Sequence, residues 1–331
     1  MPDAAGLIAE LAPSAAAATL APLAPRNWTG PLWAVLAALV WSGILIVLAR
    51  LVGTITPPTL ACVRFSFAAL VLGAWLAARG QLPHLKALTR RERALLALAA
   101  LGLAANYVFS MMALSYLTPA EASVLSQMNG MALLACGVLL LRERLSRAQA
   151  FGLVIFVCGL MLFLGPRLLG SAFDVRFLTG SALLAIGAVT WAAYAVVQRV
   201  TQNRLSSLQI LWLVCCGSAL ALLPLSSAAG FERLDAGGWI ALALASASTV
   251  VAYGAFALAL QHWSLTGTTT VTSSTPVLTW LLSWAAAAGG VAGVAVPQVG
   301  TLGIVGALLV TAGCIVTSLG QAPPQVSNSA A

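Results

Sequence analysis

Two polar stretches interrupt apolar parts of the chain: "VLSQMNGM" at residues 124–131 and "TTTVTSSTPV" at residues 268–277. Their hydroxyl and carboxamide groups can donate and accept hydrogen bonds, which suits the binding of a small polar molecule. At 100° per residue, one helical face contains Ser123, Ser126, Gln127 and Gly130, with Asn129 on its flank. These groups must face protein or water, because a polar group facing lipid without a partner costs several kcal/mol.

The rest of the chain is apolar enough to form the elements that position these groups in a membrane. Of its 331 residues, 61% are hydrophobic and 7% charged, and the mean hydropathy is +0.99. Ordinary soluble domains have about 45–50% apolar residues. Ten apolar blocks, each about long enough to cross the bilayer core, predict helices at 31–52, 58–78, 94–116, 119–141, 148–166, 179–200, 207–227, 237–260, 264–288 and 299–319.

The basic residues predict the orientation of these spans. With the N-terminus inside, the inner segments hold eleven Lys and Arg residues and the outer segments four, which matches the positive-inside rule. Both termini are therefore expected in the cytoplasm, with flexible tails at residues 1–29 and 320–331. The same rule explains the net charge of +8 without a nucleic-acid partner.

The chain contains an internal repeat. Trp41 matches Trp191 at an offset of 150, the segment from Asn106 matches that from Tyr253 at 147, and "GLVIFVCG" matches "GALLVTAG" at 154. We assign the copies to residues 30–172 and 173–319. Because each copy has five helices, the second must enter the membrane upside down. The predicted fold is an all-α integral membrane protein of ten transmembrane helices, built as two inverted five-helix repeats around a central cavity.

The polar stretch of the first copy has a counterpart in the second. At the offset of 147, its partners are Thr270, Ser273, Ser274, Pro276 and Val277. A single Ser or Thr is better explained as a hydrogen bond between helices. For the paired stretches we favour a shared polar cavity, because inverted-repeat transporters bind substrate near the midplane.

Aromatic side chains are also expected at the centre. Trp41 and Trp191 lie about ten residues inside their spans, too deep for the interfacial aromatic belt. Aromatic walls with a few polar groups suit a small amphiphilic ligand. The predicted substrate-binding residues are Trp41, Ser42, Asn106, Tyr107, Ser110, Ser123, Gln127, Asn129, Trp191, Tyr194, Tyr253, Ser273, Ser274 and Trp280.

Several segments resemble the drug/metabolite transporter superfamily, in particular its ten-helix EamA-type members. The likeness is carried by Trp41, by Arg64 in "ACVRFSFAAL", by "LTPAEASVL" and by "LLLRERLSRAQAFGLVIFVCGLML", and it covers residues 30–319. The second copy departs from this pattern, since Pro297 stands where the first copy has Glu143.

The resemblance implies a transporter in the bacterial inner membrane. Within the superfamily, the aromatic-rich centre is most similar to the YddG-like exporters of aromatic and other neutral amino acids. We therefore expect export of amino acids or similar small metabolites by alternating access. The alternatives are a broad-specificity drug exporter and an integral membrane enzyme, but paired Asp residues or a His cluster at the membrane face, expected of the enzyme, are missing from the sequence.

The charged residues narrow the expected mechanism. All eight acidic residues fall in tails, loops or helix ends, which favours flux without proton coupling. Glu121 is interpreted as a first-turn acid stabilised by the helix dipole. For Arg64 we favour snorkelling or bonding to carbonyls, with contact to a substrate carboxylate as the alternative. Phosphorylated substrates are disfavoured, since Arg64 is the only basic candidate in the cavity.

We expect no cofactor and no metal. The six cysteines lie in apolar blocks without a CxxC pair and are interpreted as small hydrophobic residues. The expected partners are the substrate and membrane lipid, and the protein is expected to be a monomer.

Overall fold

A computed structural model describes residues 28–85, 88–139, 145–168, 174–201, 204–262, 265–290 and 300–319, and within these ranges all regular structure is helical. The helices of the first half are α3 (Thr29–Ala49), α4 (Pro57–Ala78), α5 (Arg90–Ala113), α6 (Pro119–Ser126), α7 (Met128–Leu139) and α8 (Arg147–Leu168). Those of the second half are α9 (Val175–Thr201), α10 (Ser207–Leu222), α11 (Ala236–His262), α12 (Leu265–Thr272), α13 (Thr275–Ala288) and α14 (Thr301–Leu319). Two 3₁₀ turns, Leu223–Leu225 and Phe231–Arg233, lie between α10 and α11.

The spans agree with the hydropathy prediction, with one addition. In the described part of the chain, nine segments are long and apolar enough to cross a membrane, and α6 with α7 counts as one of them. The tenth predicted span, 264–288, consists of α12 and α13, which are about 12 and 21 Å long at 1.5 Å per residue. The fourth helix of each half is therefore interrupted, a feature that hydropathy alone does not predict.

Side-chain caps fix where several helices begin. Thr89 with Glu92, Thr118 with Glu121, and Ser206 with Gln209 form capping boxes at the starts of α5, α6 and α10. Ser146 and Gln149 exchange the same pair of hydrogen bonds before α8. Each box satisfies two backbone N–H groups that lack partners within the helix.

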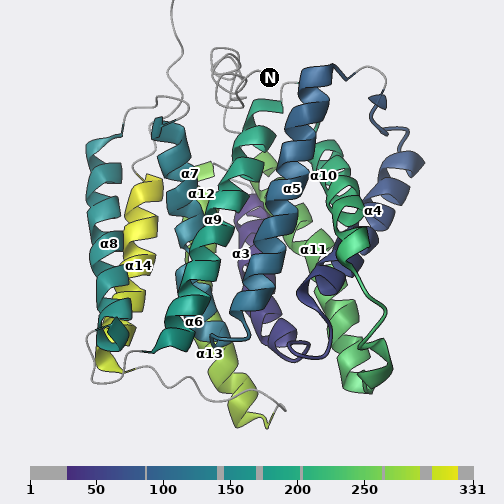
Figure 1. The fold of residues 1–331 in the computed structure, drawn as a ribbon. Helices are drawn as coiled ribbons and strands as arrows, with labels where there is room; N and C mark the ends of the chain where they lie inside the picture. The colour runs from purple at the N-terminus through teal and green to yellow at the C-terminus, as the bar shows by residue number, and fades with distance from the viewer. Residues whose placement is uncertain are drawn as a thin grey trace, which may run out of the picture.

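The two halves pack against each other in matching pairs. The third helix of each half contacts the first helix of the other, α5 with α9 and α11 with α3, and the second helices α4 and α10 contact each other. In Figure 1, α6 lies below α7, whereas α12 lies above α13. The fourth crossings thus run in opposite directions, as two inverted copies require.

The fifth helices, α8 and α14, pack side by side at one edge of the bundle (Figure 1). Four glycines lie in this contact: Gly152 and Gly159 on α8, and Gly306 and Gly313 on α14. A Cβ atom on Gly159 would lie 2.5 Å from the Val310 nitrogen and 2.9 Å from the Gly306 oxygen. Since glycine alone lets the two backbones approach this closely, these residues determine the interhelical distance. They are also the glycines that the repeat pairs at an offset of 154.

Some sequence predictions fall outside the described residues. These include residues 1–27 and 320–331 of the predicted tails, the junction between residues 172 and 173, and the positions of Glu143 and Pro297. The division into domains and the orientation of the termini therefore stay predictions.

Replacement of Gly159 by Leu should separate α8 from α14. We expect Gly159→Leu to lower the free energy of unfolding by about 1–3 kcal/mol, because overpacking forces the backbones apart. The measurement is the melting temperature of the purified protein in detergent. Gly165→Leu is the control on the same helix, since a Cβ atom at Gly165 would meet no other atom within 4 Å. Equal melting temperatures for the two variants would contradict the assigned contact.

Candidate functional site

The interruption between α12 and α13 follows from Pro276, the second residue of α13. Proline has no N–H, so it cannot donate to the carbonyl four residues earlier. The Thr275 hydroxyl donates to that carbonyl, of Thr272, at 2.5 Å, and the Ser274 hydroxyl donates to Val271 at 2.6 Å. The hydroxyl run in this segment thus satisfies carbonyl groups where the regular helix stops.

The interruption between α6 and α7 contains no proline and is centred on Gln127. Here the backbone forms hydrogen bonds between residues three apart instead of four. The Gln127 N–H donates to the Val124 carbonyl, and the Gly130 N–H donates to the Gln127 carbonyl. Ser126 donates its hydroxyl to the carbonyl of Ser123 at 2.8 Å. One turn of 3₁₀-type bonding with hydroxyl support therefore replaces the regular helix.

The two interruptions meet in space. The Gln127 Nε2 donates to the Ser273 carbonyl at 2.7 Å, so an amide from one half satisfies a carbonyl of the other. Ser42 on α3 joins them, because its Oγ lies 2.6 Å from the Ala38 carbonyl and 3.3 Å from the Thr275 carbonyl. Thr279 donates to the Ser42 carbonyl at 3.4 Å. We call Ser42, Gln127, Ser273, Thr275 and Thr279 the polar crossing.

Several hydroxyls beside the crossing are buried without a protein partner. Among the described residues, Ser123 Oγ, Thr268 Oγ1, Thr270 Oγ1 and Ser283 Oγ have none. Ser123 and Thr270 are matched by the internal repeat at an offset of 147. A buried hydroxyl without a partner is costly, so these groups provide hydrogen-bonding capacity for water or a ligand.

Aromatic rings from four helices form a second group of central side chains. The Trp41 ring lies edge-on to Tyr253 at 5.8 Å between centroids, and Tyr253 lies edge-on to Tyr194 at 6.5 Å. Trp191 contacts Tyr194 at 6.5 Å. Tyr107 lies close enough to Tyr253 for electrostatic interaction. We call Trp41, Tyr107, Trp191, Tyr194 and Tyr253 the aromatic cluster.

Arg64 borders the aromatic cluster. Its guanidinium carbon lies 4.6 Å from the centroid of the Tyr107 ring, and its Nε donates to the Ala245 carbonyl at 3.0 Å. Only 4% of its surface is exposed. Bonding to a carbonyl is therefore confirmed, whereas snorkelling toward the interface is wrong, because the side chain ends inside the protein.

The structure brings most of the predicted site residues into these two groups. Asn106 is different, since its Nδ2 donates to the Gly187 carbonyl at 2.9 Å and so joins α5 to α9. Ser110 and Asn129 are half-buried and form no side-chain hydrogen bond with the described residues. Ser274 bonds within its own segment.

Trp280 does not belong with the others. It is 39% exposed, and Trp284, one turn further along α13, is 56% exposed. Thr279 and Ser283 occupy the buried face instead. Trp280 thus lies on the outer face of the bundle, and we remove it from the predicted site.

Sequence reasoning missed the hydroxyls on the buried face of α13. Thr275, Thr279 and Ser283 are spaced four residues apart, so they form one stripe along the helix. That spacing was visible in the sequence. Trp280 is adjacent to this stripe in sequence but lies on the exposed side of α13.

Glu121 is explained by its place at the start of α6. It is 7% exposed, its carboxylate accepts a hydrogen bond from the Thr118 nitrogen at 2.9 Å, and its own nitrogen donates to the Thr118 hydroxyl. This geometry agrees with the interpretation of Glu121 as a first-turn acid.

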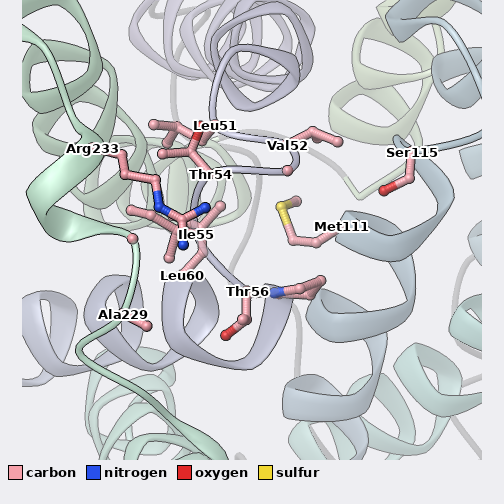
Figure 2. A pocket seen from close by; sticks show the side chains of 13 residues that line it. Leu51, Val52, Thr54, Ile55, Thr56, Leu60, Met111, Ser115, Ala229 and Arg233 are labelled. Carbon is pink, nitrogen blue, oxygen red and sulfur yellow. The ribbon is translucent and has the colours of Figure 1, made fainter.

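A cavity of about 320 Å³ lies at the end of the bundle, between the α3–α4 turn, the end of α5 and the α10–α11 connection. Figure 2 shows Arg233 beside Thr54 and Ile55 on one side and Met111 and Ser115 on the other. None of the fourteen predicted site residues lines this cavity. The polar crossing and the aromatic cluster lie elsewhere in the bundle.

The arrangement matches a known family. The sequence profile of the EamA-like transporter family matches the chain twice, over residues 28–165 and 178–319. The chain belongs to this family. The recognition of a drug/metabolite transporter from the sequence is thereby confirmed.

Similar proteins occur in bacteria. An uncharacterised transporter of Haemophilus influenzae is 29% identical over 289 residues, which cover 87% of this chain and 94% of that protein. The uncharacterised inner membrane transporter YhbE of Escherichia coli K12 is 30% identical over 294 residues, covering 88% of this chain and 92% of YhbE. A solved crystal structure at 20% identity shares the fold, with a TM-score of 0.60 over 89% of this chain and 98% of that chain.

The contact between the halves of this EamA-like transporter can be tested at Gln127. We expect Gln127→Leu to lower the free energy of unfolding by about 1–3 kcal/mol, because it leaves the Ser273 carbonyl without its donor. Thermal unfolding in detergent is the measurement. Asn129→Leu is the control, since it removes a similar amide from α7 that bonds none of the described residues. If the control destabilises equally, the crossing bond has no special role.

Proposed function

We propose that this EamA-like membrane transporter exports amino acids, with aromatic and other neutral ones favoured, or similar small metabolites. The observation that carries this proposal is the aromatic cluster beside the polar crossing. Trp41 belongs to the aromatic cluster and the next residue, Ser42, belongs to the polar crossing, so α3 holds the two groups together. Rings can accommodate an apolar side chain while hydroxyls and carbonyls bind the polar end of the same molecule.

The symmetry of the fold supports alternating access. Two inverted halves can exchange their conformations, and a site between them then opens to one side or the other. Here the interrupted fourth helices of both halves meet at the crossing, held by the bond from Gln127 to Ser273. A few hydrogen bonds can exchange more easily than a packed helix interface, so we place the moving contacts at the crossing.

We further propose that transport is not coupled to protons. In the described part of the chain, Arg64 and Glu121 are the buried charged residues, and Glu121 caps α6. No buried Asp or His in these residues could exchange a proton against substrate. We place the transporter in the bacterial inner membrane as a monomer with both termini in the cytoplasm. The inner-membrane relative YhbE and the arginine-rich inner segments support the membrane and the orientation.

A broad exporter of lipophilic cations is the second candidate within transport. Such a protein would benefit from an embedded carboxylate, and the buried charge beside the aromatic cluster is instead the cation Arg64. This charge supports a neutral or zwitterionic substrate over a cationic one. Transport also accounts for the inverted repeat better than catalysis does, since an enzyme has no need of two-sided access.

The substrate class can be tested by uptake into proteoliposomes. We expect labelled phenylalanine and leucine to enter faster than tetraphenylphosphonium. Trp41→Ala and Trp191→Ala should each reduce amino-acid uptake by roughly two- to tenfold, the worth of one aromatic contact. Trp239→Ala is the matched control, because Trp239 is 50% exposed and stacks on Phe231 away from the cluster. Faster uptake of the cation than of every amino acid would favour the second candidate.

Proton coupling has a separate test. Initial uptake of the best substrate should be the same with and without an imposed pH gradient across the vesicle membrane, because no buried acid among the described residues is free to carry the proton. Membrane potential is clamped with valinomycin and potassium. Acceleration by an inward proton gradient would refute uncoupled flux.

A further inference from the structure

We propose that Arg64 binds the carboxylate of the substrate, so that the transported molecule is a small carboxylate with an apolar or aromatic side chain. This inference rests on the proposed function and specifies its recognition site. It assigns the charged end of the substrate to α4 and α11, beside the aromatic cluster.

The first support is the unused hydrogen-bonding capacity of Arg64. An arginine has five N–H donors in a planar fork. Only the Nε–H bonds to a described residue, the Ala245 carbonyl. The terminal nitrogens have no protein acceptor there, and they are not among the polar atoms fully sealed from solvent. The side of the fork that forms bidentate pairs with carboxylates is therefore not taken up by any described residue.

The second support is the missing counterion. Arg64 forms no ion pair with the described residues. Glu121, the other buried charged residue in this part of the chain, has its carboxylate bonded to the Thr118 nitrogen. A buried cation without an anion costs several kcal/mol. A bound carboxylate would offset that cost, which gives the site a strong preference for an anionic group.

The third support is the surroundings of Arg64. The Tyr107 ring lies under the guanidinium and is tilted against the Phe65 ring, with 4.5 Å between their centroids. Tyr253 lies close enough to Arg64 for electrostatic interaction. Tyr253 also contacts Trp41 and Tyr194. A molecule bound through its carboxylate to Arg64 would therefore place its side chain against aromatic rings. Phosphates are less suitable, because a single arginine cannot neutralise a dianion.

The rival explanation is that Arg64 only connects α4 to α11. That role uses one donor and one carbonyl, and it does not require a charge in the interior. Arg176 provides the comparison, since it also donates to a backbone carbonyl, of Ser115 at 3.0 Å, and lies over a tyrosine ring, Tyr116, but at the surface. If both arginines were merely structural, loss of either would change stability without changing ligand preference.

The test measures binding to the full-length protein in detergent. Three probes each carry a phenyl ring. L-phenylalanine and 3-phenylpropionate have a carboxylate, whereas L-phenylalanine amide does not. Apparent affinities come from ligand-induced shifts of the melting temperature. For the wild type we expect the carboxylates to bind at least about tenfold more tightly than the amide. Arg64→Gln should abolish this preference, Arg64→Lys should keep part of it, and Arg176→Gln should keep all of it.

The outcomes separate this inference from the proposed function. Equal binding of amide and carboxylates by the wild type, no binding of either carboxylate, or an unchanged preference in Arg64→Gln would overturn the role of Arg64. Uptake of labelled phenylalanine into proteoliposomes is measured in parallel. Uptake without carboxylate preference would leave the proposed function standing, whereas carboxylate binding without uptake of any amino acid would refute the function and support the site. If Arg64→Gln does not fold, the carboxylate preference is measured in Arg64→Lys, where we expect it to be reduced.

Discussion

A backbone carbonyl without a donor is too costly to leave inside a membrane, and this constraint governs the centre of the transporter. Both fourth helices are interrupted, so carbonyl groups lose their usual partners there. The donors that replace them come partly from the same segment, such as Thr275, and partly from elsewhere, as Gln127 and Ser42 show. A hydrogen bond that satisfies a carbonyl in one half therefore also holds the two halves together. The polar residues in these apolar helices are thus explained first as replacement donors.

The same bundle has two kinds of contact between its halves. Where α8 meets α14, four glycines bring the two helix backbones into close contact. At the polar crossing, by contrast, single hydrogen bonds join the halves, and in the aromatic cluster ring contacts do so. Close backbone packing resists sliding, while side-chain hydrogen bonds can exchange partners. A change of access between the two membrane faces is therefore better accommodated at the crossing than at the glycine contact.

Much of the fold could be predicted because the bilayer leaves few alternatives. Span lengths, the five-helix repeat and the paired glycines all follow from hydropathy and self-comparison. The interruptions could be only half predicted: Pro276 signals one, whereas Gln127 gives no local signal and acts through a partner 146 residues away. The sequence also could not predict which side of a helix faces the centre of the bundle. Trp280 and Thr279 are neighbours in sequence, but Thr279 is buried and Trp280 is exposed, and only the packing of α13 against α3 and α6 decides which one is central.

The proposed role of Arg64 would let a buried cation serve a transporter that works without proton coupling. A protein carboxylate beside Arg64 would satisfy the guanidinium permanently and leave nothing for a ligand. With a ring and a carbonyl as its contacts among the described residues, Arg64 would stay incompletely bonded until a carboxylate bound to it. The cost of burying the cation would then fall on the ligand-free protein, and a bound carboxylate would relieve it by making the site neutral. A zwitterion bound in this way would let the halves close around it with less uncompensated charge than the protein has alone. Substrate binding and closure would thereby favour each other through the same electrostatic interaction.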